Sequence, residues 1–270
     1  DDHRARAQSL YMGSFLVGMM AGPVVGGALS VVSLRAPLII YGFLLIAASA
    51  SGAILLRNSV LAAKPTAQQE RQTITIKSAL ALSPYRSALI ISFITSWVLF
   101  GMSRSILPLF MVEEIKVTPS FMGLGFTITT IINGLFLLRA GKLSDLNGRR
   151  YSAVIGTSFV TLSIFALAFT TKPWHFIAAS VIVGFGGAFL STTPSAIVGD
   201  VLEGKGGQVI GLFQMSGDAG AMVAPIILGF ISDHYGYKPA FLATAALMSV
   251  AVFVATKLPE TRTSHLGQSQ

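Results

Sequence analysis

Residues 7–34 contain no charged side chain, and this run constrains the fold more than any other feature of the chain. An α-helix rises about 1.5 Å per residue, so a run of this length can cross the roughly 30 Å hydrocarbon core of a bilayer. Similar apolar runs recur along the sequence, separated by short charged connections. Charged residues make up 11% of the chain, whereas a soluble domain carries about 25%. The sequence therefore predicts an all-α membrane protein that crosses the bilayer repeatedly.

Eight runs have the length expected of transmembrane helices. Their predicted cores are residues 9–32, 37–56, 88–111, 118–138, 151–171, 175–198, 208–231 and 239–256. The polar segment 58–86 separates the second run from the third and is predicted to be a linker. The predicted domains are therefore 1–57 with two helices, the linker 58–86, a six-helix group at 87–258, and a tail at 259–270.

The basic residues predict the orientation of these helices. Of the 19 Lys and Arg residues, 14 fall on one side when the N-terminus, the linker, the connection 139–150, Lys205 and the tail are placed together. Arg104 lies within a span, and the other four basic residues fall on the opposite side. Basic residues are retained on the cytoplasmic side of membranes. We therefore expect both termini of the chain and the linker to be cytoplasmic, in a plasma or inner membrane.

Glycine and proline in the first run predict close helix packing. Gly18, Gly22 and Gly26 recur every four residues, so they share one helix face and allow another helix to approach closely. Pro23 lacks a backbone donor and can kink the helix in mid-span. A helix-packing motif without any further role remains an alternative explanation of this pattern.

The same pattern returns near the end of the chain. A shift of 202 positions, which places Gly18 on Gly220, also places Pro23 on Pro225 without a gap. The other matched pairs are Ser14 and Ser216, Gly27 and Gly229, Ser30 and Ser232, and Pro37 and Pro239. The first two runs thus match the last two, which predicts a repeating unit of six helices. A complete protein would have twelve spans in two parallel halves, as in secondary transporters, and we expect this chain to lack the first four.

Three segments of the sequence resemble the major facilitator superfamily, and more narrowly its drug:proton antiporter branch. Residues 18–27 are similar to the antiporter motif on the fifth helix of that family, and residues 141–150 are similar to the signature between its eighth and ninth helices. Leu146 departs from that signature, because a basic residue is common there. The run 258–261 after the last span is also familiar from the family. The resemblance implies the incomplete two-half major facilitator fold, from the fifth helix to the twelfth.

The connection 141–150 combines glycines that permit a turn with the charges of Asp145, Arg149 and Arg150. Positive-inside topology alone explains the arginines but not the spaced Gly-Asp-Gly pattern. The resemblance implies a gating latch, in which Asp145 would lie near the N-terminus of the first span, where a helix favours an anion. Asp200, at the predicted cytoplasmic end of the sixth span, is a candidate partner of Arg149. The residues expected to act in coupling or gating are Gly18, Gly22, Pro23, Gly26, Gly27, Gly141, Asp145, Gly148, Arg149, Arg150 and Asp200.

Ionisable side chains are rare inside spans and mark candidate functional sites. Asp218 lies near the middle of the seventh span, on a helix face shared with Gly211, Gln214 and Met222. Asp218 is expected either to face a water-filled cavity or to make a structural hydrogen bond to a neighbouring helix. Either arrangement would keep this face away from lipid.

The third span carries Arg104 on a face shared with Phe93, Trp97 and Phe100. This face is expected to offer a cation and aromatic surfaces to an amphipathic ligand. Alternatively, Arg104 extends outward to pair with Glu113 or Glu114. The opposite face is expected to contact lipid and carries Ile90, Ile91, Ile94, Val98 and Met102.

Two further spans contribute candidates. Phe126, Thr130 and Asn133 share one face of the fourth span, where a contact between helices explains Asn133 as well as a ligand does. The sixth span is interrupted by polar residues and a proline at 191–195, which is a weak indicator of a binding site. The residues expected to line a substrate cavity are Trp97, Phe100, Arg104, Phe126, Thr130, Asn133, Gln214, Asp218 and Met222.

Other functional classes lack support in the sequence. Residues 184–187 and 204–206 complete neither a dinucleotide fingerprint nor a P-loop, and the four histidines lack metal-ligand spacing. The net charge of +8 comes without a basic stripe with interleaved aromatics, so nucleic-acid binding is not expected. The chain has no cysteine. We expect neither an enzyme nor a cofactor, and the proton is expected to be the coupling ion.

The preferred interpretation is an exporter of a small amphipathic or hydrophobic, drug-like compound that works by proton antiport and alternating access. One alternative is uptake of a polar metabolite, and another is a non-transporting receptor or assembly partner. The expected partners are the small-molecule substrate and membrane lipid, with a monomer as the functional form. This chain by itself is not expected to transport.

Overall fold

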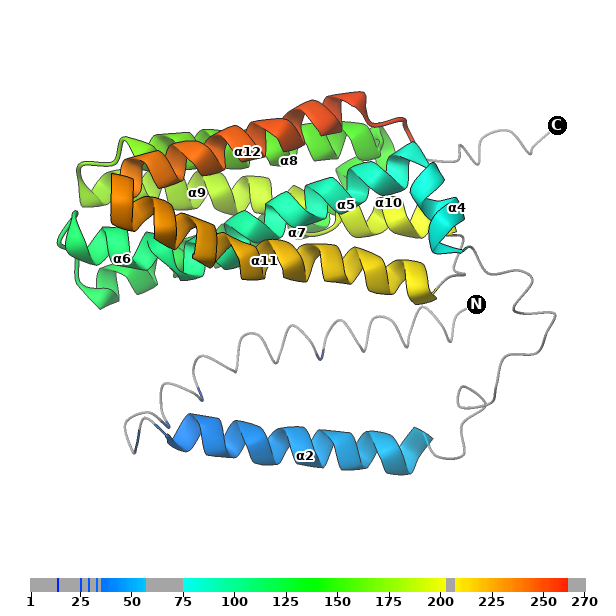
Figure 1. Ribbon diagram of the computed structural model, residues 1–270, viewed down its shortest axis with the longest axis horizontal. Helices are drawn as coiled ribbons and strands as arrows, with labels where there is room; N and C mark the ends of the chain where they lie inside the picture. The colour runs from blue at the N-terminus through cyan, green and yellow to red at the C-terminus, as the bar shows by residue number, and fades with distance from the viewer. Residues whose placement is uncertain are drawn as a thin grey trace. The chain divides into compact units, whose positions relative to one another are not determined.

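The computed structural model describes residues 35–56, 75–202 and 207–261, together with Ser14, Val25, Leu29 and Ser33. All regular secondary structure in these ranges is helical (Figure 1). Seven of the helical segments are long and apolar enough to cross a membrane. The prediction of an all-helical, multi-pass membrane protein is therefore confirmed. The first predicted span, 9–32, lies almost entirely outside the described residues, as do all five glycine and proline positions of its motif.

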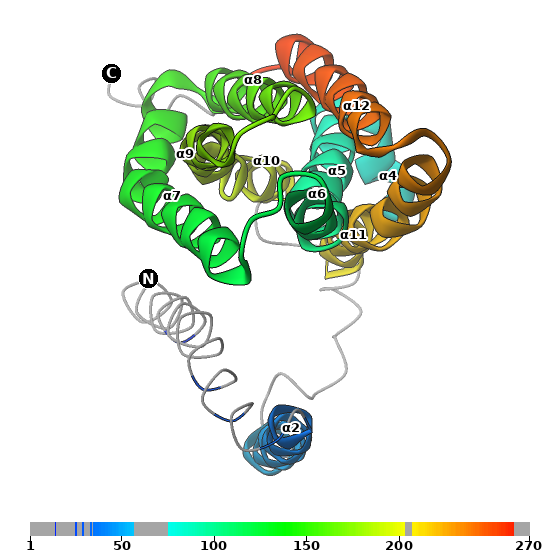
Figure 2. The ribbon, with the colours of Figure 1, turned by 90° about the vertical axis from the view of Figure 1, so that its left-hand side faces the viewer.

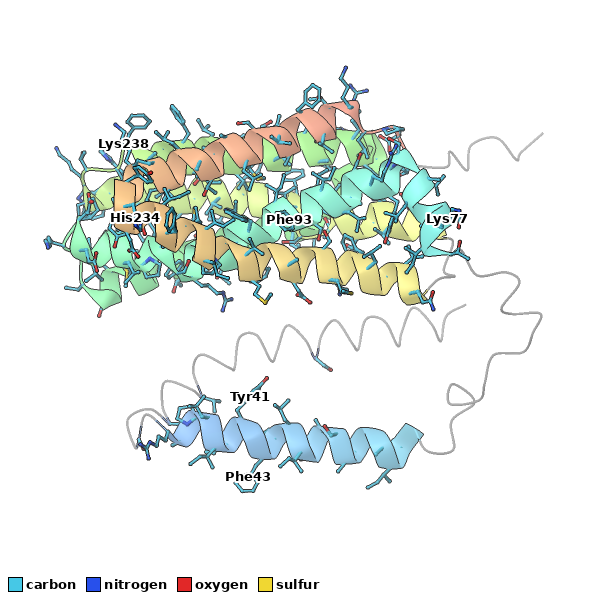
Figure 3. The ribbon with its side chains drawn as sticks, in the orientation of Figure 1. Tyr41, Phe43, Lys77, Phe93, His234 and Lys238 are labelled. Carbon is cyan, nitrogen blue, oxygen red and sulfur yellow. The ribbon has the colours of Figure 1, made fainter. Side chains whose placement is uncertain are left out.

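The chain divides into two units, residues 1–70 and residues 71–270. In the first unit the structure describes one long helix, α2 (Ala36–Leu56), which agrees with the second predicted span. Tyr41 and Phe43 project from different sides of α2 (Figure 3), and both are exposed. A helix that is apolar all round suits an environment of lipid or other membrane helices.

The second unit contains the other six spans of the described residues. Its first span consists of α5 (Ser83–Ser96), the π-helical segment η2 (Trp97–Met102) and α6 (Ile106–Glu113), preceded by the short α4 (Ile76–Ala81). The later elements are α7 (Pro119–Asn147), α8 (Arg149–Ala168), α9 (Pro173–Leu190), α10 (Thr193–Leu202), α11 (Gly207–Tyr235) and α12 (Tyr237–Lys257). Lys77 of α4 and Lys238 of α12 lie at opposite ends of this bundle, with Phe93 between them (Figure 3).

The helices of the second unit pack around a shared apolar core. α9 lies between α7 and α8, and α8 packs against α12 (Figure 2). α5 contacts α10, α11 and α12, so it occupies the interior of the unit. The buried Tyr85 hydroxyl of α5 donates a hydrogen bond to the Val209 carbonyl oxygen of α11, at 2.7 Å. Because this bond lies at the α4 end of the bundle, it fixes where α11 begins relative to α5.

Small residues let α11 and the first span of the unit approach closely. A Cβ atom at Gly220 would collide with the Phe93 carbonyl oxygen, and one at Gly101 would collide with the Ala224 side chain. The Ser216 hydroxyl donates to the Leu89 carbonyl oxygen, at 2.8 Å. Close backbone contact of this kind is how helices associate where the surroundings are as apolar as the side chains. The structure thus gives the C-terminal copy of the repeated glycine pattern a packing role.

The helices differ from the predicted spans at three places. α7 continues to Asn147, so most of the predicted loop 139–150 is helical and the turn is confined to Gly148. The sixth predicted span is broken into α9 and α10 at residues 191–192, inside the polar interruption. Residues 76–86, predicted as the end of the linker, form α4 and the first turn of α5.

One face of the third predicted span was assigned wrongly. Ile91, Ile94, Val98 and Met102 were expected to contact lipid, but they are buried in the protein core, and Ile90 is exposed. The reason is that α5 is an interior helix with neighbours on several sides. A hydrophobic face is equally suited to lipid and to other apolar helices, so its apolar character does not distinguish them.

Candidate functional site

The junction between α7 and α8 places several charged groups together. Gly148 connects the two helices with φ of 98°, a left-handed conformation that side chains other than glycine rarely adopt. The turn positions Asp145, on the last turns of α7, beside Arg149 at the start of α8. Gly141 lies inside α7, and a Cβ there would meet no atom of the described residues within 4 Å. The sharp turn therefore depends on Gly148 and not on Gly141.

Arg149 joins three helices. Its Nη1 lies 2.6 Å from Asp145 Oδ1 and 3.1 Å from Ser144 Oγ, and its Nε lies 3.0 Å from Asp200 Oδ2. Asp200 belongs to α10, so the guanidinium bridges α7, α8 and α10. Asp200, which the sequence proposed as the partner of Arg149, is thus in contact with it. The expected location of Asp145 near the first span involves residues outside the described ranges.

The two ion pairs differ in exposure. The Arg149 side chain is 16% exposed, Asp200 is 26% exposed and Asp145 is 66% exposed. Water screens an exposed pair more strongly, so the pair with Asp200 is expected to contribute more than the pair with Asp145. Because Arg149 is largely shielded, removing its anionic partner would leave a poorly solvated cation.

The segment after the last span completes this cluster. Glu260 accepts hydrogen bonds from the backbone N–H groups of Arg149, at 2.8 Å, and Arg150, at 3.3 Å. These N–H groups begin α8 and have no partner within the helix, and an anion at a helix N-terminus is favoured. The Thr261 hydroxyl donates to Asp200 Oδ2, at 3.0 Å. We refer to Asp145, Arg149, Asp200, Glu260 and Thr261 as the Arg149 cluster.

The roles of Glu260 and Thr261 were not predicted from the sequence. The run 258–261 resembles a segment of the family, but the sequence alone assigns no contact to these residues. The contact is close, because a Cβ atom at Gly148 would collide with the Glu260 carboxylate. Gly148 is therefore required both by its backbone conformation and by the space that Glu260 occupies. Arg150 has an exposed side chain and contributes its backbone N–H.

Three of the predicted cavity residues lie together on the exposed face of α11. Gln214, Asp218 and Met222 are all exposed, and Gly211 continues the same face. Among the described residues, no ion pair involves Asp218. A carboxylate on a membrane span needs water or a polar partner. The arrangement therefore fits a surface that contacts water or another part of the protein.

Arg104 and Phe100 are also exposed and lie close to each other. The Arg104 guanidinium lies 5.5 Å from the centre of the Phe100 ring, within the range of a cation–π contact. Within the described part of the chain, Arg104 forms no ion pair with Glu113, Glu114 or Asp218. Glu113 instead accepts a hydrogen bond from the Tyr237 hydroxyl. The outward pairing considered for Arg104 is therefore not present among the residues that the structure describes.

Trp97 does not share the environment of Phe100 and Arg104, which corrects the expectation of a common cavity face. The Trp97 side chain is 6% exposed, and its indole N–H points to the Thr244 hydroxyl of α12, at 3.5 Å. The physical reason is the π-helical turn that begins at Trp97, because its wider winding changes the angular spacing assumed for an α-helix. Phe100 consequently points outward while Trp97 points into the core.

The candidates on α7 are divided between packing and exposure. Phe126 packs edge-on against Phe176 of α9, with ring centres 6.1 Å apart. Asn133 is half-buried and faces α9, where a Cβ at Gly187 would lie 3.1 Å from its amide nitrogen. Thr130 is exposed and donates to the Phe126 carbonyl oxygen. Phe126 and Asn133 are thus part of the α7–α9 contact.

Comparison with known proteins places this sequence in a family. The sequence model of the Major Facilitator Superfamily matches residues 89–270. Multidrug resistance protein MdtG of Yersinia enterocolitica is 29% identical over 162 residues, which cover 58% of this chain and 39% of the relative. The proteins of the same name from Escherichia fergusonii and Serratia proteamaculans are each 27% identical over 164 residues.

The matched region spans about two fifths of the length of these relatives. The family match covers residues 89–270, which include every span described in the second unit except the first turns of α5. The family consists of membrane transporters and not of enzymes, in agreement with the sequence-based expectation. The chain belongs to the Major Facilitator Superfamily.

Proposed function

We propose that the protein is a secondary active transporter that exports a small amphipathic or hydrophobic compound by proton antiport. The observation that carries this proposal is the family membership of residues 89–270, the region that also contains the Arg149 cluster. The relatives named as multidrug resistance proteins support a drug-like substrate. Exposed aromatic and thioether side chains, such as Phe100 and Met222, suit an amphipathic ligand.

The proposed architecture is the two-half fold of the family. In it, the helices from α5 to α12 form the C-terminal half, and 1–57 supplies the last two helices of the N-terminal half. The eight predicted spans would correspond to the fifth to twelfth helices, with 58–86 as the central linker and 259–270 as the tail. The basic connections support cytoplasmic termini in a plasma or inner membrane. The functional form would be a monomer that contacts lipid and one small-molecule substrate.

The Arg149 cluster is proposed to act as a gating latch. Alternating access requires the two halves to rock about a central site, so contacts at one end must form in one state and break in the other. Arg149 connects α7, α8 and α10 through its carboxylate partners. Such a cluster stabilises one arrangement of these helix ends, and its loss would shift the population toward the other arrangement. The glycine motif at 18–27 is proposed to act in the same coupling.

The exposed face of α11 is proposed to line the substrate pathway. Gln214, Asp218 and Met222 are exposed, and together with Phe100 and Arg104 they offer charge, hydrogen bonding and apolar surface. Thr130 is exposed as well and could line the same pathway. Phe126 and Asn133 are only partly exposed, because they pack against α9, so they would contribute only at the edge of the pathway. Protons and substrate are proposed to compete for binding to the Asp218 carboxylate.

One observation favours a second candidate. Arg104 and Asp218 are exposed charges without an ion-pair partner among the described residues, and such charges also suit a polar metabolite. Proton-coupled uptake of a polar metabolite is therefore the alternative. A non-transporting receptor would move neither substrate nor protons.

The test uses the protein expressed from its complete reading frame in inside-out membrane vesicles. A proton gradient is imposed and followed with a fluorescent dye while amphipathic compounds are added. Wild-type protein, Asp218→Asn and Asp145→Asn are compared, with Asp233→Asn as a matched control at the exposed end of α11. Compound-dependent loss of the gradient in wild type and in the control, but not in Asp218→Asn, supports antiport. If no compound dissipates the gradient while a labelled metabolite enters intact cells, the export proposal is wrong.

A further inference from the structure

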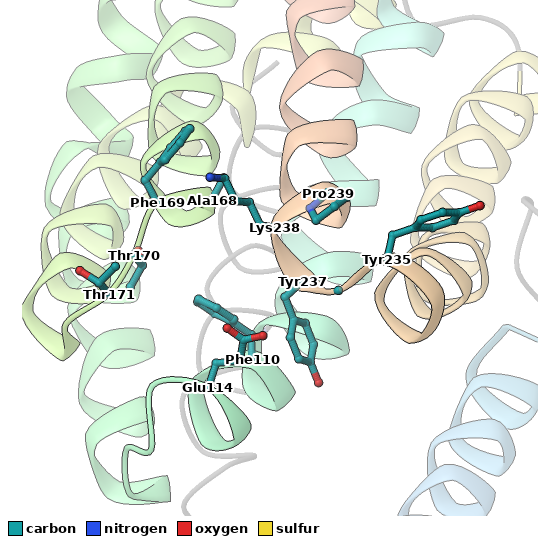
Figure 4. A pocket seen from close by; sticks show the side chains of 11 residues that line it. Phe110, Glu114, Ala168, Phe169, Thr170, Thr171, Tyr235, Tyr237, Lys238 and Pro239 are labelled. Carbon is teal, nitrogen blue, oxygen red and sulfur yellow. The ribbon is translucent and has the colours of Figure 1, made fainter.

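A pocket lies at the opposite end of the bundle from the Arg149 cluster. α8 begins at Arg149 and ends at Ala168, and Ala168 is one of the residues that line the pocket (Figure 4). The cavity has a volume of about 400 Å³, within the size range of small-ligand sites. It is bounded by the end of α6, the connection between α8 and α9, and the turn between α11 and α12. None of the residues predicted to form the cavity or the latch lines it.

The walls of the pocket are held by contacts between these segments. Phe110 is buried against Phe241 and Tyr237, with ring centres 5.0 Å and 5.6 Å apart. The Tyr237 hydroxyl donates to Glu113 Oε2, at 2.5 Å, and so ties the start of α12 to the end of α6. Gly236, with φ of 87°, makes the turn that places Tyr237 there. The walls of the pocket are therefore fixed by contacts within the protein itself.

Opposite charges reach this pocket from different elements. Glu114 is the C-cap residue that follows α6, Lys238 lies in the first turn of α12, and both line the cavity (Figure 4). No ion pair joins them among the residues that the structure describes. The Lys238 ammonium instead lies 4.5 Å from the centre of the Phe169 ring. A cavity with a carboxylate and an ammonium that do not neutralise each other suits a ligand with both charges.

The pocket also lies at the level where the candidate membrane spans end. The candidate spans that surround it end or begin at Glu113, Ala168, Pro173, Tyr235 and Tyr237. Trp174 and Tyr235 are both largely exposed at this level. Tyrosine and tryptophan are enriched at membrane–water interfaces. If these spans cross a bilayer, lipid head groups lie at the height of the pocket.

We propose that this pocket binds the head group of a zwitterionic phospholipid that carries a primary amine. The ammonium of the lipid would lie beside the Glu114 carboxylate and the partly exposed ring of Tyr237, and an aromatic ring suits a cation. Its phosphate would lie beside Lys238 and the exposed Thr171. A trimethylated amine has no N–H to donate to Glu114, and an anionic lipid without an amine leaves Glu114 unpaired. The proposal is independent of the transported substrate.

Native mass spectrometry can test this with the protein from its complete reading frame in a mild detergent. Phosphatidylethanolamine, phosphatidylcholine and phosphatidylglycerol with the same acyl chains are titrated separately. We expect phosphatidylethanolamine to bind about fivefold more tightly than the other two lipids, the size of effect expected for one exposed charge-assisted contact. Glu114→Gln should remove the preference over phosphatidylcholine, and Lys238→Gln should weaken the binding of both lipids. Lys238→Arg should retain binding.

The control variants remove one negative or one positive charge from the same end of the bundle without changing a residue that lines the pocket. Asp233→Asn and Lys172→Gln meet this condition, because both residues are exposed and neither lines the pocket. Both should bind lipid as wild type does. Equal affinity for the three lipids, or an unchanged preference in Glu114→Gln, overturns the proposal. Displacement of the lipid by soluble glycerophosphoethanolamine at equal concentration would assign the site to a free solute and also overturns it.

Discussion

Arg149 and Asp200, 51 residues apart in the sequence, form an ion pair with an Nε–Oδ2 distance of 3.0 Å between α8 and α10. The pair is part of a cluster in which Glu260 and Thr261, from beyond the last span, contact the same two residues. A charged contact that spans three parts of the chain constrains how the helix ends at this side of the bundle can move. It is consequently the contact most suited to test whether this end gates transport.

Asp200→Asn is expected to reduce transport more than Asp145→Asn, although both proteins should insert normally. The Asp200 carboxylate is the more shielded partner of Arg149, so its loss leaves a cation with less access to water. We expect transport to fall about tenfold with Asp200→Asn and severalfold with Asp145→Asn, since the exposed pair is worth less. Vesicle transport at matched expression levels is the measurement. Wild-type flux in both variants would rule out a gating role for the cluster.

Gly148→Ala is expected to destabilise the protein, whereas Gly141→Ala should not. A residue other than glycine at φ of 98° is strained, and a Cβ there would also collide with Glu260. Strain of this kind costs about 1–3 kcal/mol. Gly141 lies in a helix with open space around it, and alanine there should be neutral or stabilising by up to about 1 kcal/mol. Thermal unfolding of both variants in detergent provides the comparison.

Gly220→Ala is expected to disturb the packing of α11 on α5. Its Cβ would meet the Phe93 carbonyl oxygen, which is backbone and cannot move aside as a side chain can. Overpacking at such a contact costs about 1–3 kcal/mol. Gly229→Ala is the matched control, because a Cβ there would meet no atom of the described residues within 4 Å. Equal melting temperatures for the two variants would contradict the close approach seen here.

Trp97→Ala is expected to reduce the stability of the protein, whereas Phe100→Ala is expected to alter transport without reducing stability. Trp97 is buried and faces Thr244, so its truncation is expected to cost about 3–5 kcal/mol of stability. Phe100 is exposed and lies beside Arg104, so Phe100→Ala should leave the melting temperature nearly unchanged and alter the apparent affinity for aromatic substrates. Melting curves and concentration-dependent transport distinguish the two outcomes. A loss of stability with Phe100→Ala equal to that with Trp97→Ala would contradict this division.

The sequence by itself determined the helical class of the protein and the positions of seven of its spans. It could do so because a segment inserts into a membrane when about 20 consecutive residues are predominantly apolar, which is a local property of the chain. It also identified Asp200 as a partner of Arg149, because both residues lie at span ends on the same predicted side and carry opposite charges. These inferences needed no knowledge of how the helices pack.

Only the tertiary structure decided which apolar faces are buried and which residues from distant segments meet. Ile91 and Trp97 are in the core because α5 has neighbours on several sides and the chain winds as a π-helix from Trp97. Glu260 contacts the start of α8 because α12 returns beside α8, which is a consequence of packing and not of any local pattern. Apolar side chains are equally compatible with lipid and with protein. The arrangement of the helices therefore decides between these two environments, and it also decides which charged ends meet.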